Sequence, residues 1–184
     1  MRLSDLNIGV RLGAAFAAVL LLMTAMIAVG MWELSNIAAA KNEMKGTAYK
    51  HQLANEWLKG ISTNAVRTFA KAKSVSADDQ QFFQAEMKKV SARLSEIQKE
   101  MEGLIHTEEG KRLFAEVGAR RKAYSGIRDS IFELKAKPET MQPEVDVLVA
   151  SKLVPAMNAY IQSVEQLARF QKSLFDKADT TIDQ

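Results

Sequence analysis

The feature that most constrains this chain is an uncharged apolar segment, Leu12–Trp32, near its N-terminus. Arg11 precedes the segment and Glu33 follows it, and its sequence is LGAAFAAVLLLMTAMIAVGMW. Because a helix rises about 1.5 Å per residue, roughly 20 such residues cross the hydrocarbon core of a bilayer, which is about 30 Å thick. The sequence therefore predicts a transmembrane helix over residues 12–32, with the polar bulk of the chain, residues 33–184, on one side of the membrane.

A cleavable signal peptide is the main alternative for this segment. Arg2 and Arg11 would form its basic part, and Ala28 and Gly30 its small-residue cleavage site. The apolar run is longer than the roughly 7–15 residues of a signal core, and Met31–Trp32 is a poor cleavage context. A buried helix of a soluble protein would carry a polar stripe, which this run lacks. We expect an uncleaved anchor.

The orientation follows from the charges around the anchor. Arg2 and Arg11, opposed by Asp5, favour a cytoplasmic N-terminus over residues 1–11. Trp32 then fits the outer headgroup level, so we expect the protein in the inner (plasma) membrane with its polar domain in the periplasm. The chain has no cysteine, which is compatible with an oxidising compartment and excludes a disulfide.

The composition of the polar part indicates an all-α protein. Alanine, lysine, glutamate, glutamine and leucine dominate, and all three prolines fall between Pro138 and Pro155. The formal net charge of the whole chain is only +3, with both signs interleaved. Such a surface is typical of solvated helices and gives no support for nucleic-acid binding.

Three polar breaks, residues 74–79, 106–110 and 137–143, divide the soluble part into four helices. We expect them over about residues 33–74, 79–106, 108–136 and 144–183, with Thr107 as a helix cap. Pro155 falls near the start of the last helix, where it sets either a bend or the true first turn. The first helix continues the transmembrane helix without a break. Short turns between helices of this length predict an antiparallel up-down-up-down four-helix bundle. Because the last helix returns toward the bilayer, we expect a fragment that stops before a second membrane crossing.

Apolar residues recur along the last three helices at alternating steps of three and four, the spacing of a bundle seam. The predicted seam residues are Phe83, Met87, Val90, Leu94, Ile97, Met101 and Leu104; Leu113, Val117, Arg120, Tyr124, Ile127, Ile131 and Leu134; and Leu153, Met157, Tyr160, Val164 and Leu167.

Polar residues gather at one level of the predicted bundle. Arg121, Tyr124 and Arg128 share one face of the third helix, and Asn64 and Arg67 share a face of the first. Arg67 and Arg128 each lie about eight residues, or roughly 12 Å, before a membrane-distal turn.

Guanidinium groups bind carboxylates through paired hydrogen bonds, so this cluster predicts an anion site. Asp129 lies about 100° around the helix from Arg128, so the sequence predicts no acid on the same face. The alternative is that the arginines form surface or intersubunit ion pairs.

Other chemistries find no support. His51 and His106 are the only histidines and fall at different levels, so they predict no metal site. The chain has no glycine-rich phosphate loop and no assignable nucleophile–base pair. We expect no enzyme activity and no cofactor.

The opening Asp5–Gly13, DLNIGVRLG, and the junction Trp32–Ile37 resemble the N-terminus of bacterial methyl-accepting chemotaxis receptors. The resemblance implies a periplasmic sensor that works as a homodimer and binds its ligand near the distal end. It further implies a small shift of the last helix, passed through a second membrane helix to cytoplasmic signalling proteins. Sensor domains of histidine kinases and cyclases are similar, and either is an alternative.

The resemblance also bears on the ligand. Amino-acid receptors of the family carry arginines on the first helix and at the start of the fourth; this chain has Arg67 on the first but no arginine at the second place. Arg121, Tyr124 and Arg128 are instead similar to the pattern in receptors for citrate and C4-dicarboxylates. A di- or tricarboxylate is the expected ligand, held by Arg67, Arg121, Arg128, Tyr124 and Asn64. The alternative is a dimerisation or partner-binding module without a ligand.

Overall fold

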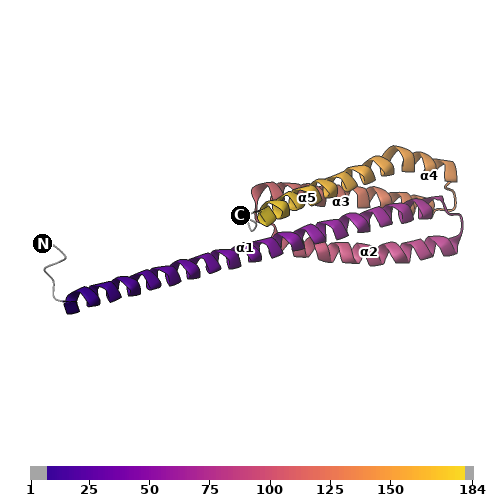
Figure 1. Ribbon diagram of the computed structural model, residues 1–184. Coiled ribbons are helices and arrows are strands. Elements are labelled where there is room, and N and C mark those ends of the chain that lie inside the picture. Colours follow the sequence, from indigo (N-terminus) through magenta and orange to yellow (C-terminus); the bar gives the residue numbers. More distant parts are fainter. Residues whose placement is uncertain (1–7, 181–184) are drawn as a thin grey trace.

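The computed structural model describes residues 8–180 and contains four long helices (Figure 1). Three of them are single elements, and the fourth consists of α4, a π-helical turn η2, and α5 in direct succession. The bounds are α1, Ile8–Lys73; α2, Ala77–Leu104; α3, Glu108–Lys135; α4, Gln142–Leu148; η2, Val149–Leu153; and α5, Val154–Thr180. The predicted all-α, antiparallel four-helix bundle with a continuous N-terminal helix is confirmed.

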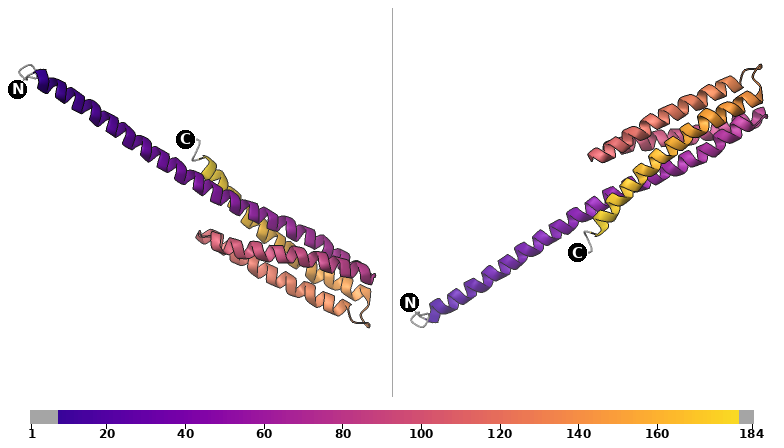
Figure 2. Two further views of the ribbon diagram at one scale, coloured as in Figure 1. Left: turned by 90° about the horizontal axis from the view of Figure 1, so that it is seen from below. Right: turned by 90° about the horizontal axis from the view of Figure 1, so that it is seen from above.

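Helix α1 is 66 residues long and extends well beyond the bundle (Figures 1 and 2). Its N-terminal part is apolar, and apolar side chains from Leu12 to Trp32 are exposed. Within the described residues, this is the one helix that is long and apolar enough to cross a membrane. Residues 1–7, which include most of the predicted cytoplasmic segment, lie outside the described part of the chain.

The helix starts are fixed by local hydrogen bonds. Thr107 caps α3, as predicted, because its Oγ1 accepts from the N–H of Gly110 at 3.2 Å. Ser76 caps α2 by accepting from the N–H of Asp79 at 3.2 Å. Acidic residues occupy the first turn of both helices, where they complement the positive end of the helix dipole.

The fourth helix begins at Gln142, two residues before its expected start. Pro155 lies in its interior, thirteen residues further on, so of the two roles expected for this proline the first turn is excluded. A proline ring inside an α-helix clashes with the carbonyl four residues earlier. Here the turn before Pro155 is widened, and the N–H of Val154 bonds the carbonyl of Val149. The π-helical turn thereby accommodates the proline. Residues 181–183 of the predicted helix lie outside the described part.

The core largely follows the predicted seams. Fully buried side chains include Trp57, Ile97, Met101, Val117 and Leu167. Arg120 is an exception, because it is exposed and pairs with Glu116 at 2.6 Å. Its assignment to the seam was wrong. The inward step after Val117 is four residues, which turns Arg121 toward the bundle in place of Arg120.

The four helices are not evenly spaced. Helix α1 packs against α2 and α5, and α5 packs against α3, whereas α2 and α3 approach each other little. The α1–α2 contact is close at Gly60, where an added Cβ would lie 2.7 Å from Cδ2 of Leu94. The C-terminal end of α5 lies beside α1 at the end where α1 leaves the bundle (Figure 2). Side chains must therefore fill the space between α2 and α3.

Candidate ligand-binding site

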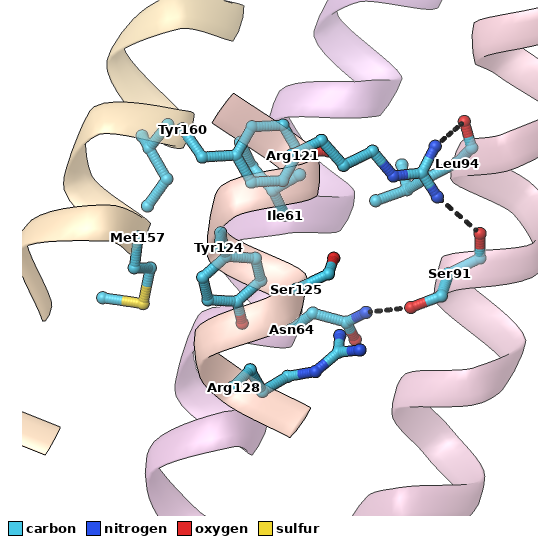
Figure 3. Close-up of a pocket in the computed structure, with 11 residues that line it drawn as sticks. Ile61, Asn64, Ser91, Leu94, Arg121, Tyr124, Ser125, Arg128, Met157 and Tyr160 are labelled. Atoms are coloured by element: carbon cyan, nitrogen blue, oxygen red, sulfur yellow. Dashed lines mark hydrogen bonds between the residues drawn. The ribbon is translucent and has the colours of Figure 1, made fainter. Parts of the chain in front are cut away.

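A cavity of about 150 Å³ lies inside the bundle, in the half nearer the α1–α2 and α3–α4 turns, and all four helices contribute to it (Figure 3). Its wall combines charged, polar and apolar side chains. The lining residues are Ile61, Asn64, Ser91, Leu94, Arg121, Tyr124, Ser125, Arg128, Met157, Tyr160 and Ile161. Four of the five residues predicted for the site, Asn64, Arg121, Tyr124 and Arg128, therefore face one cavity.

Two tyrosines form a fixed aromatic wall. Trp57 donates from Nε1 to the hydroxyl oxygen of Tyr160 at 2.7 Å, and the rings of Tyr160 and Tyr124 lie 5.8 Å apart. The hydroxyl of Tyr124 is hydrogen-bonded to that of Thr68 at 2.8 Å. Burial raises the pKa of Tyr124, and it raises the pKa of Tyr160 to about 12. Both phenols are therefore neutral at physiological pH and able to donate hydrogen bonds.

Arg121 bridges the wide space between α3 and α2. Its Nη1 donates to Oε1 of Gln98 at 2.6 Å and to the carbonyl of Leu94 at 3.3 Å. Its Nη2 donates to Oγ of Ser95 at 2.8 Å and to the carbonyl of Ser91 at 3.2 Å. All these acceptors are neutral, so in the described part of the chain the charge of Arg121 has no carboxylate partner.

Arg128 closes the distal side of the cavity. Its guanidinium lies 5.7 Å from the ring centroid of Tyr124 and points toward Asn64 (Figure 3). It also pairs with Asp129, Nη2 to Oδ1 at 2.7 Å. The expectation that Arg128 has no acid partner was wrong, because the long arginine side chain curls back to the neighbouring residue. Asp129 itself is exposed, so solvent weakens this pair.

Arg67 lies outside the cavity. It pairs across the α1–α2 contact with Glu86, Nη2 to Oε2 at 3.1 Å. Its placement among arginines without acid partners was therefore wrong as well. Arg67 and Asn64 share a helix face, as expected, but Arg67 is one turn nearer the distal end and its neighbour on α2 is an acid. The α1–α2 pairing that brings Glu86 to this position is a tertiary contact.

Sequence reasoning missed the contributions of α2 and α5. Ser91 and Leu94 come from α2, and Met157, Tyr160 and Ile161 from α5. Leu94, Met157 and Tyr160 were predicted as seam residues but not as part of a site, and Ser91 was not singled out. Extending the same comparison of levels to the fourth helix would have found Met157 and Tyr160.

The bundle and its polar cavity define a class of protein, the helical sensor domain. A family model described as a four helix bundle sensory module for signal transduction matches residues 5–184. The chain belongs to this family, whose members are sensory modules of methyl-accepting chemotaxis receptors. No curated protein matches it. The resemblance to chemotaxis receptors is thus confirmed over almost the whole chain. The role of this chain in chemotactic signal transduction follows from its family.

Proposed function

We propose that this chain is the sensor region of a transmembrane chemotaxis receptor and that its cavity binds a small organic acid of the malate and citrate class. The observation that carries the proposal is the charge of the wall. Arg121 and Arg128 both line the cavity, and none of its described lining residues is an aspartate or a glutamate.

The chemistry of the wall suits a carboxylate. Guanidinium groups hold carboxylates in place through paired hydrogen bonds, and Tyr124 adds a neutral hydroxyl. Arg128 is the leading candidate for direct contact, because its present partner Asp129 is exposed and easily exchanged. A volume of about 150 Å³ is that of a site for a small molecule, so a C4 acid is closer to this size than citrate, which requires wall side chains to move.

The remaining predicted residues differ in how directly each one can reach the ligand. While Arg121 stays anchored on α2, its four Nη hydrogens are occupied, so it offers the ligand its charge and its Nε–H donor. Asn64 contributes from α1. Arg67 reaches a ligand only after it releases Glu86, so a direct contact is the weakest part of the prediction.

The cellular arrangement belongs to the same proposal. The apolar part of α1 crosses the inner membrane, the bundle lies in the periplasm, and two chains form a homodimer. Helix α5, which carries Met157 and Tyr160, continues toward a second membrane helix that passes the signal to cytoplasmic signalling proteins.

Titration tests the proposal directly. The 184-residue chain in detergent micelles is titrated with malate and with citrate by calorimetry, and its melting temperature is followed by circular dichroism. We expect saturable heat and a rise in melting temperature. Arg128→Ala is expected to weaken binding by about 2–5 kcal/mol, the cost of removing one partner of a desolvated charge contact.

Arg112→Ala is the matched control, since Arg112 lies on the same helix, is exposed and pairs with Glu109. It should leave the affinity unchanged. Absence of heat and of any thermal shift at millimolar acid would refute the proposed ligand class.

A partner-binding module is the second candidate function. Large apolar side chains are exposed at and near the distal turns, with Val75 88% and Met141 71% accessible, and Phe82 is exposed on the second turn of α2. Exposed apolar patches commonly mark protein interfaces. A bundle whose stability is unchanged by all organic acids, and which captures a protein through this end, would favour the second function.

A further inference from the structure

Asn64 presents a buried hydrogen-bond acceptor at the cavity that nothing in the described chain satisfies. Asn64 is 5% exposed and lines the cavity. Its Oδ1 is buried, and no hydrogen-bond donor among residues 8–180 reaches it. A buried acceptor without a partner is destabilising. Arg67 Nη1 and Gln171 Oε1 are also buried and unpaired, but of these three residues only Asn64 lines the cavity, where a bound molecule can supply the missing donor.

The orientation of this amide is fixed by its other end. Nδ2 donates to the backbone carbonyl of Met87 at 3.2 Å and to Oγ of Ser91 at 3.3 Å. A backbone carbonyl can only accept, so the nitrogen must face Met87 and the oxygen must face away from it. Figure 3 shows Oδ1 turned toward the side of the cavity on which the guanidinium of Arg128 lies.

We propose that the cavity selects acids that carry a hydroxyl group beside the carboxylate, with Asn64 Oδ1 accepting the hydroxyl hydrogen. This inference rests on the proposed function, because it assumes a carboxylate held by Arg128 and Arg121. The inference specifies which substituent, next to the carboxylate, the site recognises. A ligand with a hydroxyl pairs this buried acceptor, whereas a ligand without a donor leaves it unpaired, and the difference corresponds to about 5- to 150-fold in affinity.

The charge of the wall separates a hydroxyl from an amino group. An ammonium group is also a donor, but it would lie beside Arg128 and within the field of Arg121. No described lining residue is an acid that could balance it. A neutral hydroxyl satisfies Oδ1 without this repulsion, so the site favours a 2-hydroxy acid over the corresponding 2-amino acid.

Three C4 dicarboxylates that differ at a single carbon test the inference. Malate carries a hydroxyl at that carbon, succinate a hydrogen and aspartate an ammonium group. Each is titrated by calorimetry into the 184-residue chain in detergent micelles. We expect malate to bind at least about 5-fold more tightly than succinate, and aspartate to bind most weakly of the three.

The outcomes separate this inference from the function on which it rests. Equal affinity for malate and succinate would overturn the inference and leave the organic-acid site standing. Tightest binding of aspartate would overturn the charge argument. No binding of any of the three, nor of citrate, would refute the proposed function itself.

A variant pair assigns the discrimination to Asn64. In Asn64→Ala, the preference for malate over succinate should fall to within about 2-fold, because both ligands then meet the same wall. Asn55→Ala is the control, since Asn55 is an exposed asparagine of the same helix whose side chain meets His51. It should keep the full preference, and a full preference retained in folded Asn64→Ala would also overturn the inference. Should Asn64→Ala fail to fold, the three-ligand comparison on the unaltered chain still decides it.

Discussion

Replacing Tyr160 with phenylalanine removes one oxygen atom from the bundle interior and leaves the aromatic ring in place. That oxygen accepts the only hydrogen that the indole of Trp57 can donate, at 2.7 Å. Trp57 is 0% exposed and does not line the cavity, so its N–H has no ready access to water in place of the lost acceptor. We expect Tyr160→Phe to lower the free energy of unfolding because it strands a buried N–H group.

The magnitude follows from the burial of both partners. Leaving a buried donor unsatisfied costs about 1–3 kcal/mol. For a domain of this size, each 1 kcal/mol moves the melting temperature by roughly 2–4 °C. Tyr160→Phe should therefore melt about 2–12 °C below the unaltered protein. A Trp57→Phe, Tyr160→Phe double variant should show a smaller loss than the sum of the single variants.

Tyr49→Phe is the matched control for the same chemical change. The hydroxyl of Tyr49 is hydrogen-bonded to Glu100, but Tyr49 is 41% exposed and water can replace that contact. Its effect should stay within about 0.5 kcal/mol. Thermal unfolding is followed by circular dichroism of the chain in micelles. If Tyr160→Phe and Tyr49→Phe melt at the same temperature, the structural role assigned to the buried hydrogen bond is refuted.

Two further predictions concern the same region. Because burial raises the pKa of Tyr160 from 10.0 to about 12, its contribution to stability is complete below pH 10 and is lost as the pH rises toward 12. Between pH 10 and 12, the free energy of unfolding, measured with denaturant, should fall by about 1–3 kcal/mol more in the unaltered protein than in Tyr160→Phe. Parallel plots of this free energy against pH for the two proteins would contradict the prediction. Gly60→Ala places a Cβ 2.7 Å from Leu94, whereas Gly126→Ala meets nothing within 4 Å. Gly126→Ala should raise stability by roughly 0.5–1 kcal/mol and Gly60→Ala should fall at least 1 kcal/mol below it, and equal melting temperatures would show that α1 and α2 are not in close contact there.

The fold was predictable because its signals are local and repeated. The uncharged run identifies the membrane helix, and the three polar breaks separate the four helices of the bundle. The alternating three- and four-residue steps mark the inward faces of the last three helices. Short turns then allow few arrangements of the four helices. The failure at Arg120 has a physical cause. A 3.6-residue helix drifts about 20° per heptad relative to a strict seven-residue repeat, so steps of three and four become hard to distinguish. Side-chain burial then decides between Arg120 and Arg121.

For the candidate site, the sequence predicted only its position along the bundle axis. Counting residues from the turns placed Arg67 and Arg128 at one level and Asn64, Tyr124 and Arg121 near it, and of these five residues all but Arg67 line the cavity. It could not show that α2 and α3 stand apart, because that spacing depends on how all four helices pack. Nor could it foresee that Arg67 meets Glu86 or that Arg121 is anchored on carbonyls of α2. These are contacts between helices, and no pattern within one helix specifies them.

Two residues that break the apolar pattern, Asn64 and Arg121, line the cavity. Trp57, Ile97 and Val117 pack with little compromise, whereas Asn64 keeps a buried oxygen unpaired and Arg121 keeps a charge without a carboxylate. Each exception lowers the stability of the empty bundle, and such departures from local consistency are expected at functional sites. The proposed ligand, which supplies a carboxylate and a hydroxyl, would remove both deficits at once. Binding at 100 times the dissociation constant would then add about 2.7 kcal/mol to the stability of the bundle, so thermal stability is itself a measure of occupancy of the proposed site.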